Sequence, residues 1–178
     1  RADDRLGDDS GVDISGNYGI IGGWQGANAY LFDVTTGASI AELVPTGAKS
    51  GLYGIGAAVD SATGLAAVGN RDNGADSMTY LFDLSGTQVG SIAVQGTGIA
   101  ISGTTIAIGS EWENVIRLYD VTTPASPSLL GEVTGIPGGN RNKNMALDGN
   151  TLVVGATMYD VSSFPAAATA LVPTGTTT

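Results

Sequence analysis

Histidine and cysteine are both absent from this 178-residue sequence, and lysine and arginine together number only seven. Without imidazole or thiolate, most nucleophile–base pairs and nearly all zinc sites are excluded, because those chemistries require one group or the other. The 17 acidic side chains give a formal net charge of −10, which is repelled by a phosphate backbone and by an anionic membrane. We therefore expect no nucleic-acid partner.

Long apolar runs are also missing, since none approaches the roughly 18 residues that a membrane helix requires, and we expect no membrane insertion. Charged residues make up 13% of the chain, which is low for a helical protein and ordinary for an all-β one. An acidic surface stays hydrated and suits secreted proteins, so the expected location is extracellular or at the cell surface.

Four copies of one unit fill most of the chain. A phrase of the type Tyr-Leu-Phe-Asp recurs, and its aspartates are Asp33, Asp83, Asp120 and Asp160. These aspartates are predicted to lock turns by accepting hydrogen bonds from backbone N–H groups a few residues further on. Upstream lies a second phrase, which runs over 12–16 in the first copy and over 145–149 in the fourth.

Each copy is predicted to form four short strands, because apolar β-formers alternate with clusters of Gly, Asn, Asp and Thr. In the first copy these strands are expected at about 11–15, 18–22, 27–33 and 38–44. Tight turns follow the first strand, where Gly16, Gly103 and Gly149 are expected to supply a positive φ. Almost no helix is expected, because no segment combines a helical apolar stripe with caps.

The third strand of the first copy is apolar on both faces, since Ala29 and Leu31 oppose Tyr30 and Phe32. A two-sheet sandwich leaves its outer positions polar, whereas a radial stack of sheets covers both faces of each sheet. The sequence therefore predicts an all-β fold, a β-propeller-type array of four four-stranded antiparallel blades. The expected domain division is an acidic arm at 1–10, a repeat domain at 11–175 with blades at about 11–50, 51–97, 98–137 and 140–175, and a tail at 176–178.

The repeat phrases resemble those of cell-surface β-propeller proteins. Residues 4–7, 12–16, 20–22 and 29–33 resemble the FG-GAP repeat of integrin α-chains and bacterial surface proteins. Residues 116–127 resemble the LVIVD-type propeller repeat of secreted proteins. The resemblance implies a propeller and an adhesion role. FG-GAP repeats often carry a calcium loop, whose full spacing is not present here, and the family's usual seven blades would need a longer chain.

The loops between the second and third strands of the blades are predicted to emerge on one face, and they hold the only two tryptophans. Exposed aromatic rings beside carboxylates and amides suit a sugar or a protein partner, although each tryptophan could instead cover its own blade. The candidate ligand-binding residues are Trp24, Gln25, Arg71, Glu111, Trp112, Glu113 and Asn114.

Three functions are compatible with these features. The favoured hypothesis is a non-catalytic extracellular module for protein or glycan binding. The second is a structural subunit that assembles through open blade ends into a larger ring or a filament. Asp13 favours open ends, because the other copies carry alanine there and a carboxylate is costly on a dry face. The third is a propeller enzyme of hydrolase or lactonase type, but no catalytic residue is predicted, because Glu111 and Glu113 on one loop define no cleft.

Calcium is the one cofactor that the sequence suggests, through oxygen atoms of Asp72, Asn73 and Asp76, with a solvated acidic loop as the alternative. If these residues bind the ion, millimolar calcium will raise the melting temperature by mass action, and Asp72→Ala will remove that gain. Thermal melts of both proteins with and without calcium test this. If calcium does not change the melting temperature of the unsubstituted protein, these carboxylates are solvated surface charges and not a calcium site.

Overall fold

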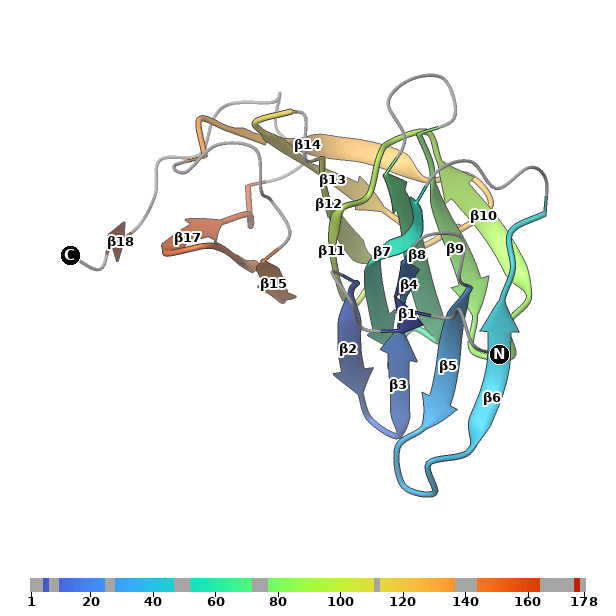
Figure 1. Ribbon diagram of the computed structural model, residues 1–178. Coiled ribbons are helices and arrows are strands. Elements are labelled where there is room, and N and C mark those ends of the chain that lie inside the picture. The colour runs from blue at the N-terminus through green and yellow to red at the C-terminus, as the bar shows by residue number, and fades with distance from the viewer. Residues whose placement is uncertain are drawn as a thin grey trace.

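The computed structural model describes residues 5–6, 10–24, 28–46, 52–71, 77–110, 113–136, 144–163 and 175–176. Over these ranges the chain forms strands and turns, with no helix and hence no helix that could cross a membrane. Four four-stranded antiparallel sheets follow one another along the chain as the blades of a β-propeller (Figure 1). The predicted fold class is confirmed.

In every blade the strands adjoin in chain order and the first strand is the innermost, and only blade one skips a strand, β4. Blade one contains β2 (Val12–Ser15), β3 (Tyr18–Ile21), β5 (Ala29–Asp33) and β6 (Ser39–Leu43). Blade two contains β7 (Leu52–Asp60), β8 (Leu65–Arg71), β9 (Thr79–Asp83) and β10 (Gln88–Ile92). Blade three contains β11 (Gly98–Ser102), β12 (Thr105–Gly109), β13 (Val115–Asp120) and β14 (Ser128–Thr134). Blade four contains β15 (Met145–Asp148), β16 (Thr151–Val154), β17 (Thr157–Asp160) and β18 (Gly175–Thr176), and a separate pair joins β1 (Arg5–Leu6) to β4 (Gly23–Trp24).

The turns form where the sequence predicts them. In the hairpins after β2, β11 and β15, Gly16, Gly103 and Gly149 have φ values of 57°, 56° and 52°, a region that disfavours other residues. After the third strand, Asp33 accepts hydrogen bonds from the backbone N–H and the hydroxyl of Thr35 at 2.8 and 2.5 Å. The Thr35 hydroxyl contributes most to lowering the pKa of Asp33.

The same turn recurs in the other blades. Asp83 accepts from Ser85 and from the N–H of Thr87, and equivalent bonds are made by Asp120 and Asp160. In each case the hydrogen bond from the side chain two residues on is the largest cause of the lowered pKa of the aspartate. The predicted turn-locking role of the four aspartates is confirmed.

An apolar cluster fills each junction between successive blades. Leu31 and Phe82 are buried between blades one and two, Leu81 lies between blades two and three, and Leu118 with Tyr159 lies between blades three and four. Alternation along β9 sends neighbouring side chains into different junctions, because successive residues of a strand point to opposite faces. The two middle blades are therefore covered on both faces.

The blades form an open arc. The innermost strands adjoin in chain order, with β2 against β7, β7 against β11, and β11 against β15. Over the described residues, no comparable packing joins β2 to β15, and blade four stands at one side of the other three in Figure 1. The outer faces of blades one and four are therefore the two ends of the array.

Leu81 is 0% exposed at the junction of blades two and three. Leu81→Ala should therefore lower the free energy of unfolding by about 2–5 kcal/mol. The cost has two parts, the lost transfer free energy and the cavity left behind. Leu129→Ala is the control, because Leu129 is 51% exposed on β14, and its effect should stay within about 0.5 kcal/mol. Urea denaturation measures both. Equal losses in the two variants would contradict this account of the core.

Candidate functional site

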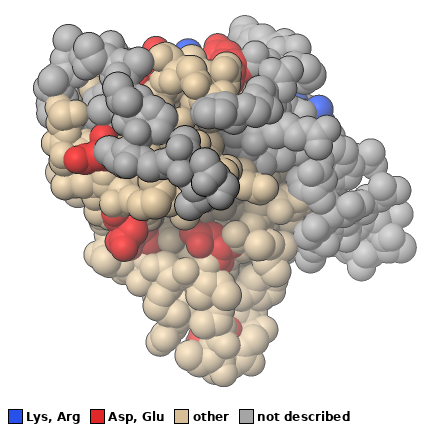
Figure 2. Space-filling view, turned by 90° about the vertical axis from the view of Figure 1, so that its left-hand side faces the viewer, with Lys and Arg blue, Asp and Glu red and all other residues tan. Residues whose placement is uncertain are grey.

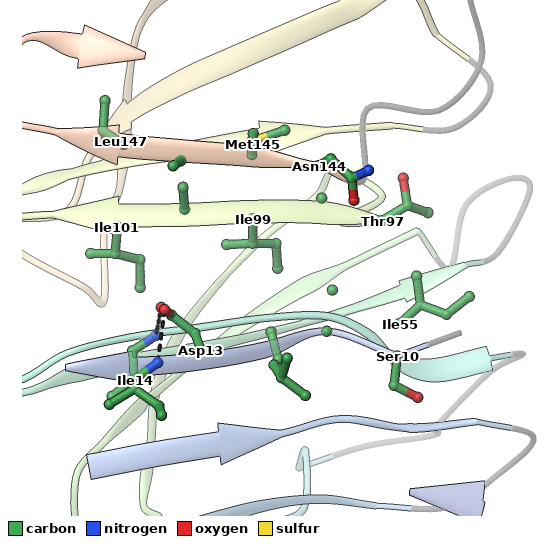
Figure 3. Close-up of a pocket in the computed structure, with 18 of the residues that line it drawn as sticks. Ser10, Asp13, Ile14, Ile55, Thr97, Ile99, Ile101, Asn144, Met145 and Leu147 are labelled. Carbon is green, nitrogen blue, oxygen red and sulfur yellow. Dashed lines mark hydrogen bonds between the residues drawn. The ribbon is translucent and has the colours of Figure 1, made fainter. Parts of the chain in front are cut away.

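The innermost strands of all four blades line one cavity of about 540 Å³ (Figure 3). Its wall consists largely of glycine, alanine, short polar side chains and aliphatic side chains from β2, β7, β11 and β15. Asp13 is the only titratable side chain among the residues that line it. Any acid–base chemistry by a titratable side chain in this cavity would therefore depend on Asp13.

The Asp13 carboxylate is already engaged by two backbone donors. Its Oδ1 accepts from Ile14 N–H at 2.8 Å, and its Oδ2 accepts from Val59 N–H of blade two at 2.9 Å. These bonds meet the cost of placing a carboxylate between blades, so Asp13 joins blade one to blade two. The expectation that Asp13 marks a free blade end is wrong, because this residue faces the next blade.

A polar contact of another kind recurs at every junction between successive blades. Between blades one and two, Ser15 Oγ accepts a hydrogen bond from Ser61 N–H at 3.0 Å. Between blades two and three, Asp60 Oδ2 accepts from Gly103 N–H at 2.7 Å. In both cases the acceptor is the last residue of an innermost strand, and the donor is the first turn residue of the next blade.

The junction between blades three and four follows the same rule, since Ser102 Oγ accepts from Gly149 N–H at 2.9 Å. We name the last residue of each innermost strand the latch residue, and the latch residues are Ser15, Asp60, Ser102 and Asp148. Sequence reasoning assigned these positions no role. Their signal is a short acceptor, Ser or Asp, at one fixed place in all four repeats, directly followed by Gly or Ser.

The structure describes four of the seven residues of the predicted loop site. Trp24 ends β4, where its backbone pairs with Arg5, and Arg71 ends β8 with a half-buried side chain. Three members lie outside the described residues, namely Gln25, Glu111 and Trp112, and so do the candidate calcium ligands Asp72, Asn73 and Asp76. Within the described ranges, no three carboxylates gather in a way that could hold a metal ion.

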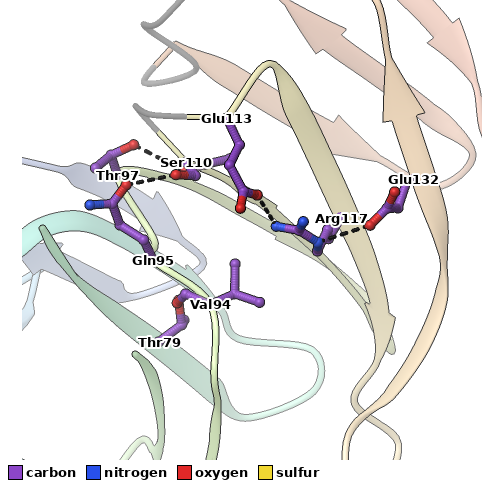
Figure 4. Close-up of polar contacts among 9 residues, drawn as sticks. Thr79, Val94, Gln95, Thr97, Ser110, Glu113, Arg117 and Glu132 are labelled. Atoms are coloured by element: carbon purple, nitrogen blue, oxygen red, sulfur yellow. Dashed lines mark hydrogen bonds and ion pairs between the residues drawn. The ribbon is translucent and has the colours of Figure 1, made fainter. Parts of the chain in front are cut away.

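The other two described members of the predicted loop site are Glu113, drawn in Figure 4, and Asn114, which directly precede β13 of blade three. Glu113 forms an ion pair with Arg117 of β13, and Arg117 also donates to Glu132 Oε1 of β14 at 2.9 Å. Burial alone lowers the pKa of Arg117, but the two carboxylates outweigh it and the net pKa is raised. Glu113 is thus held by its own blade, whereas Asn114 beside it is exposed.

A neighbouring polar group fixes the connection from blade two to blade three, also drawn in Figure 4. Ser110 donates to Gln95 Oε1 at 2.7 Å, and Thr97 donates to the carbonyl of Gly109 at 3.0 Å. All three side chains are at most 4% exposed, so their hydrogen bonds satisfy buried groups. This group holds the connecting segment in place.

No family model and no curated protein matches the chain. Among solved structures, the hydrazine synthase of Kuenenia stuttgartiensis is similar, with a TM-score of 0.64 and 18% identity over 85% of this chain and 46% of that one. The complex of KlAtg21 with the coiled-coil of AgAtg16 gives a TM-score of 0.61 and 17% identity over 83% of this chain and 50% of that one. The chain thus spans about half the length of the structures it matches. At this identity the likeness concerns the fold alone, which is that of a β-propeller.

The latch residues offer a matched pair for testing. Asp60→Ala should lower the free energy of unfolding by about 1–3 kcal/mol, because it removes the acceptor of Gly103 N–H across the junction and of Ala62 N–H in its own turn. Asp148→Ala, at the same repeat position in blade four, should stay within about 0.5 kcal/mol, because no group among the described residues donates to the Asp148 carboxylate. Denaturation of both variants in dilute solution measures the difference. Equal effects would show that the junction hydrogen bond contributes nothing.

Proposed function

We propose that this chain is a non-catalytic binding module that acts through protein contacts at the cell surface or outside the cell. The observation that carries the proposal is the face of blade one that points away from blade two. We name it the leading face, and by strand register it contains Val12, Ile14, Ile21, Tyr30 and Phe32. The opposite face of the same sheet carries Ile20 and Leu31, which are buried against blade two.

The leading face exposes apolar side chains that the repeat elsewhere buries. Val12 and Ile14 are 65% and 69% exposed, whereas Ala57 and Val59, at the same positions of blade two, are 5% and 2% exposed. An apolar patch of this kind on a folded domain is typical of an interaction site.

The two aromatic residues of the leading face follow the same pattern. Tyr30 and Phe32 are half-buried with ring centroids 6.3 Å apart. Their counterparts in blade two, Tyr80 and Phe82, are 7% and 0% exposed against blade one. Aromatic anchors of this type dominate the energetics of protein interfaces, which supports a protein as the partner.

The location and the repeat family are part of the proposal. The resemblance to FG-GAP and LVIVD-type repeats supports an extracellular adhesion role. The acidic surface also supports this role. On the side of the molecule drawn in Figure 2, carboxylates are spread over the described surface, whereas basic groups lie only near its top. A protein or glycan partner on the tryptophan loops is a separate proposal about the ligand.

A second candidate function is that of a structural subunit. It is favoured by the far end of the arc, where Met158 of blade four is 48% exposed and Ala146 and Asp148 are exposed as well. An array with two uncovered ends resembles a segment of a larger assembly.

The binding function can be tested with one charge substitution at a time. Ile14→Asp should abolish binding to a panel of immobilised secreted proteins and glycans, because a carboxylate cannot be buried unpaired in an apolar contact. Leu129→Asp is the matched control, since Leu129 is exposed on blade three away from the leading face. Both variants should melt within a few degrees of the unsubstituted protein, because both positions are on the surface.

Three outcomes are decisive. Loss of binding only in Ile14→Asp supports the leading face. Loss only in Trp112→Ala, without a change in melting temperature, would place the interaction on the loops instead. No binding by the unsubstituted protein to any member of the panel, and none to a second copy of itself, would contradict the proposed function.

A further inference from the structure

We propose that blade four of one copy of this chain packs against the leading face of a second copy, so that two copies close a ring of eight blades, four from each. The inference rests on the proposed function, because it names the partner of the same leading face. Its basis is the repeat itself, which shows at three junctions how one blade receives the next.

The outer face of blade four has the features of a surface that receives another blade. We name it the trailing face, and by strand register it contains Ala146, Asp148, Val153 and Met158. Met158 takes the repeat position that Leu31, Leu81 and Leu118 occupy in the other blades. Those three leucines are 0% exposed against the following blade, whereas Met158 is 48% exposed.

The two free faces complement each other in the manner of the internal junctions. Between blades one and two, Tyr80 and Phe82 pack in one cluster with Leu31 and Ile20. On the free faces the corresponding residues are Tyr30 and Phe32 on blade one, and Met158 and Val153 on blade four. A contact between the two faces would therefore repeat a packing arrangement that the fold already uses.

The latch residues give an independent observation. Asp148 is the fourth latch residue. At the internal junctions, a latch residue accepts a hydrogen bond from the backbone N–H of the first turn residue in the following blade. In blade one that residue is Gly16, whose place in the repeat is the same as that of Gly103 and Gly149. Within the described residues, no group donates to the exposed Asp148 carboxylate and none accepts from Gly16 N–H.

Pairing between copies completes this hydrogen bond. The Asp148 carboxylate of one copy accepts from Gly16 N–H of the other, as Asp60 accepts from Gly103 N–H inside the chain. The Asp60 carboxylate shows that an aspartate at the latch position can accept this hydrogen bond when the two blades are packed together. A buried charge-assisted bond of this kind also selects the register of the two blades.

The proposed closure at two copies concerns the array of four blades described here. A contact between two different faces is heterologous, and it gives a closed ring when the rotation per copy completes a turn. The chain covers 50% and 46% of the length of the two solved structures it resembles, so two copies amount to about the length of one of those chains. Each copy carries a net charge of −10, and salt should therefore tighten the association by screening the repulsion.

Sedimentation velocity over a range of protein concentrations tests the proposal. The unsubstituted chain should form a dimer, and Ile14→Asp and Met158→Asp should each weaken dimerisation by more than about tenfold. Asp148→Ala should weaken it by about tenfold through the lost charge-assisted hydrogen bond. Leu129→Asp should leave the dimer unchanged. Thermal melts in dilute solution check that every variant is folded.

A mixing experiment separates this contact from other pairings. Ile14→Asp and Met158→Asp chains should fail to dimerise alone but should form a mixed dimer together, because the mixture restores one intact junction. A dimer broken by Ile14→Asp and unaffected by Met158→Asp would overturn the proposal in favour of head-to-head pairing. Open-ended polymers would overturn the two-copy ring. A chain that stays monomeric at all concentrations but still binds the panel would overturn this inference and leave the proposed function standing.

Discussion

The structure depends on one requirement, which is that both apolar faces of a four-stranded sheet be covered. Strand alternation places Tyr80 and Phe82 on one face of blade two and Leu81 on the other, and neither face can be left in water without losing the free energy of burial. Radial stacking meets the requirement for the two middle blades. The outer faces of blades one and four are not covered, as the exposed side chains of Ile14 and Met158 show. Both functional proposals follow from these two uncovered faces.

Polar groups determine how the sheets stack. Apolar contacts between sheets are not directional, so the register of one blade on the next depends on hydrogen bonds across the junction. Ser15, Asp60 and Ser102 each accept one backbone N–H from the following blade, and Asp13 adds a further bond at the first junction. The turn aspartates act within a blade, whereas the latch residues act between blades.

Much of the fold could be predicted from the sequence, because repeated apolar alternation and glycine turns are local signals. The strands of blade one were expected within about two residues of their observed bounds, and the turn role of Asp33 followed from its neighbours. The role of Asp13 could not be predicted, since its partner Val59 is 46 residues away and only the stacked blades bring the two together. The latch bonds were missed for the same reason. The tryptophan-loop site stays a prediction, because Gln25, Glu111 and Trp112 lie outside the described residues.

Each blade junction is closed by a hydrogen bond from the first turn residue of the following blade. Residue-resolved amide hydrogen exchange tests it most directly. The N–H groups of Gly103 and Gly149 should exchange slowly at every protein concentration, because they are bonded inside the chain. Gly16 N–H should exchange fast in dilute solution and become protected as the concentration rises. Rapid exchange at Gly103 and Gly149, matching that of Gly16 in dilute solution, would contradict the claim.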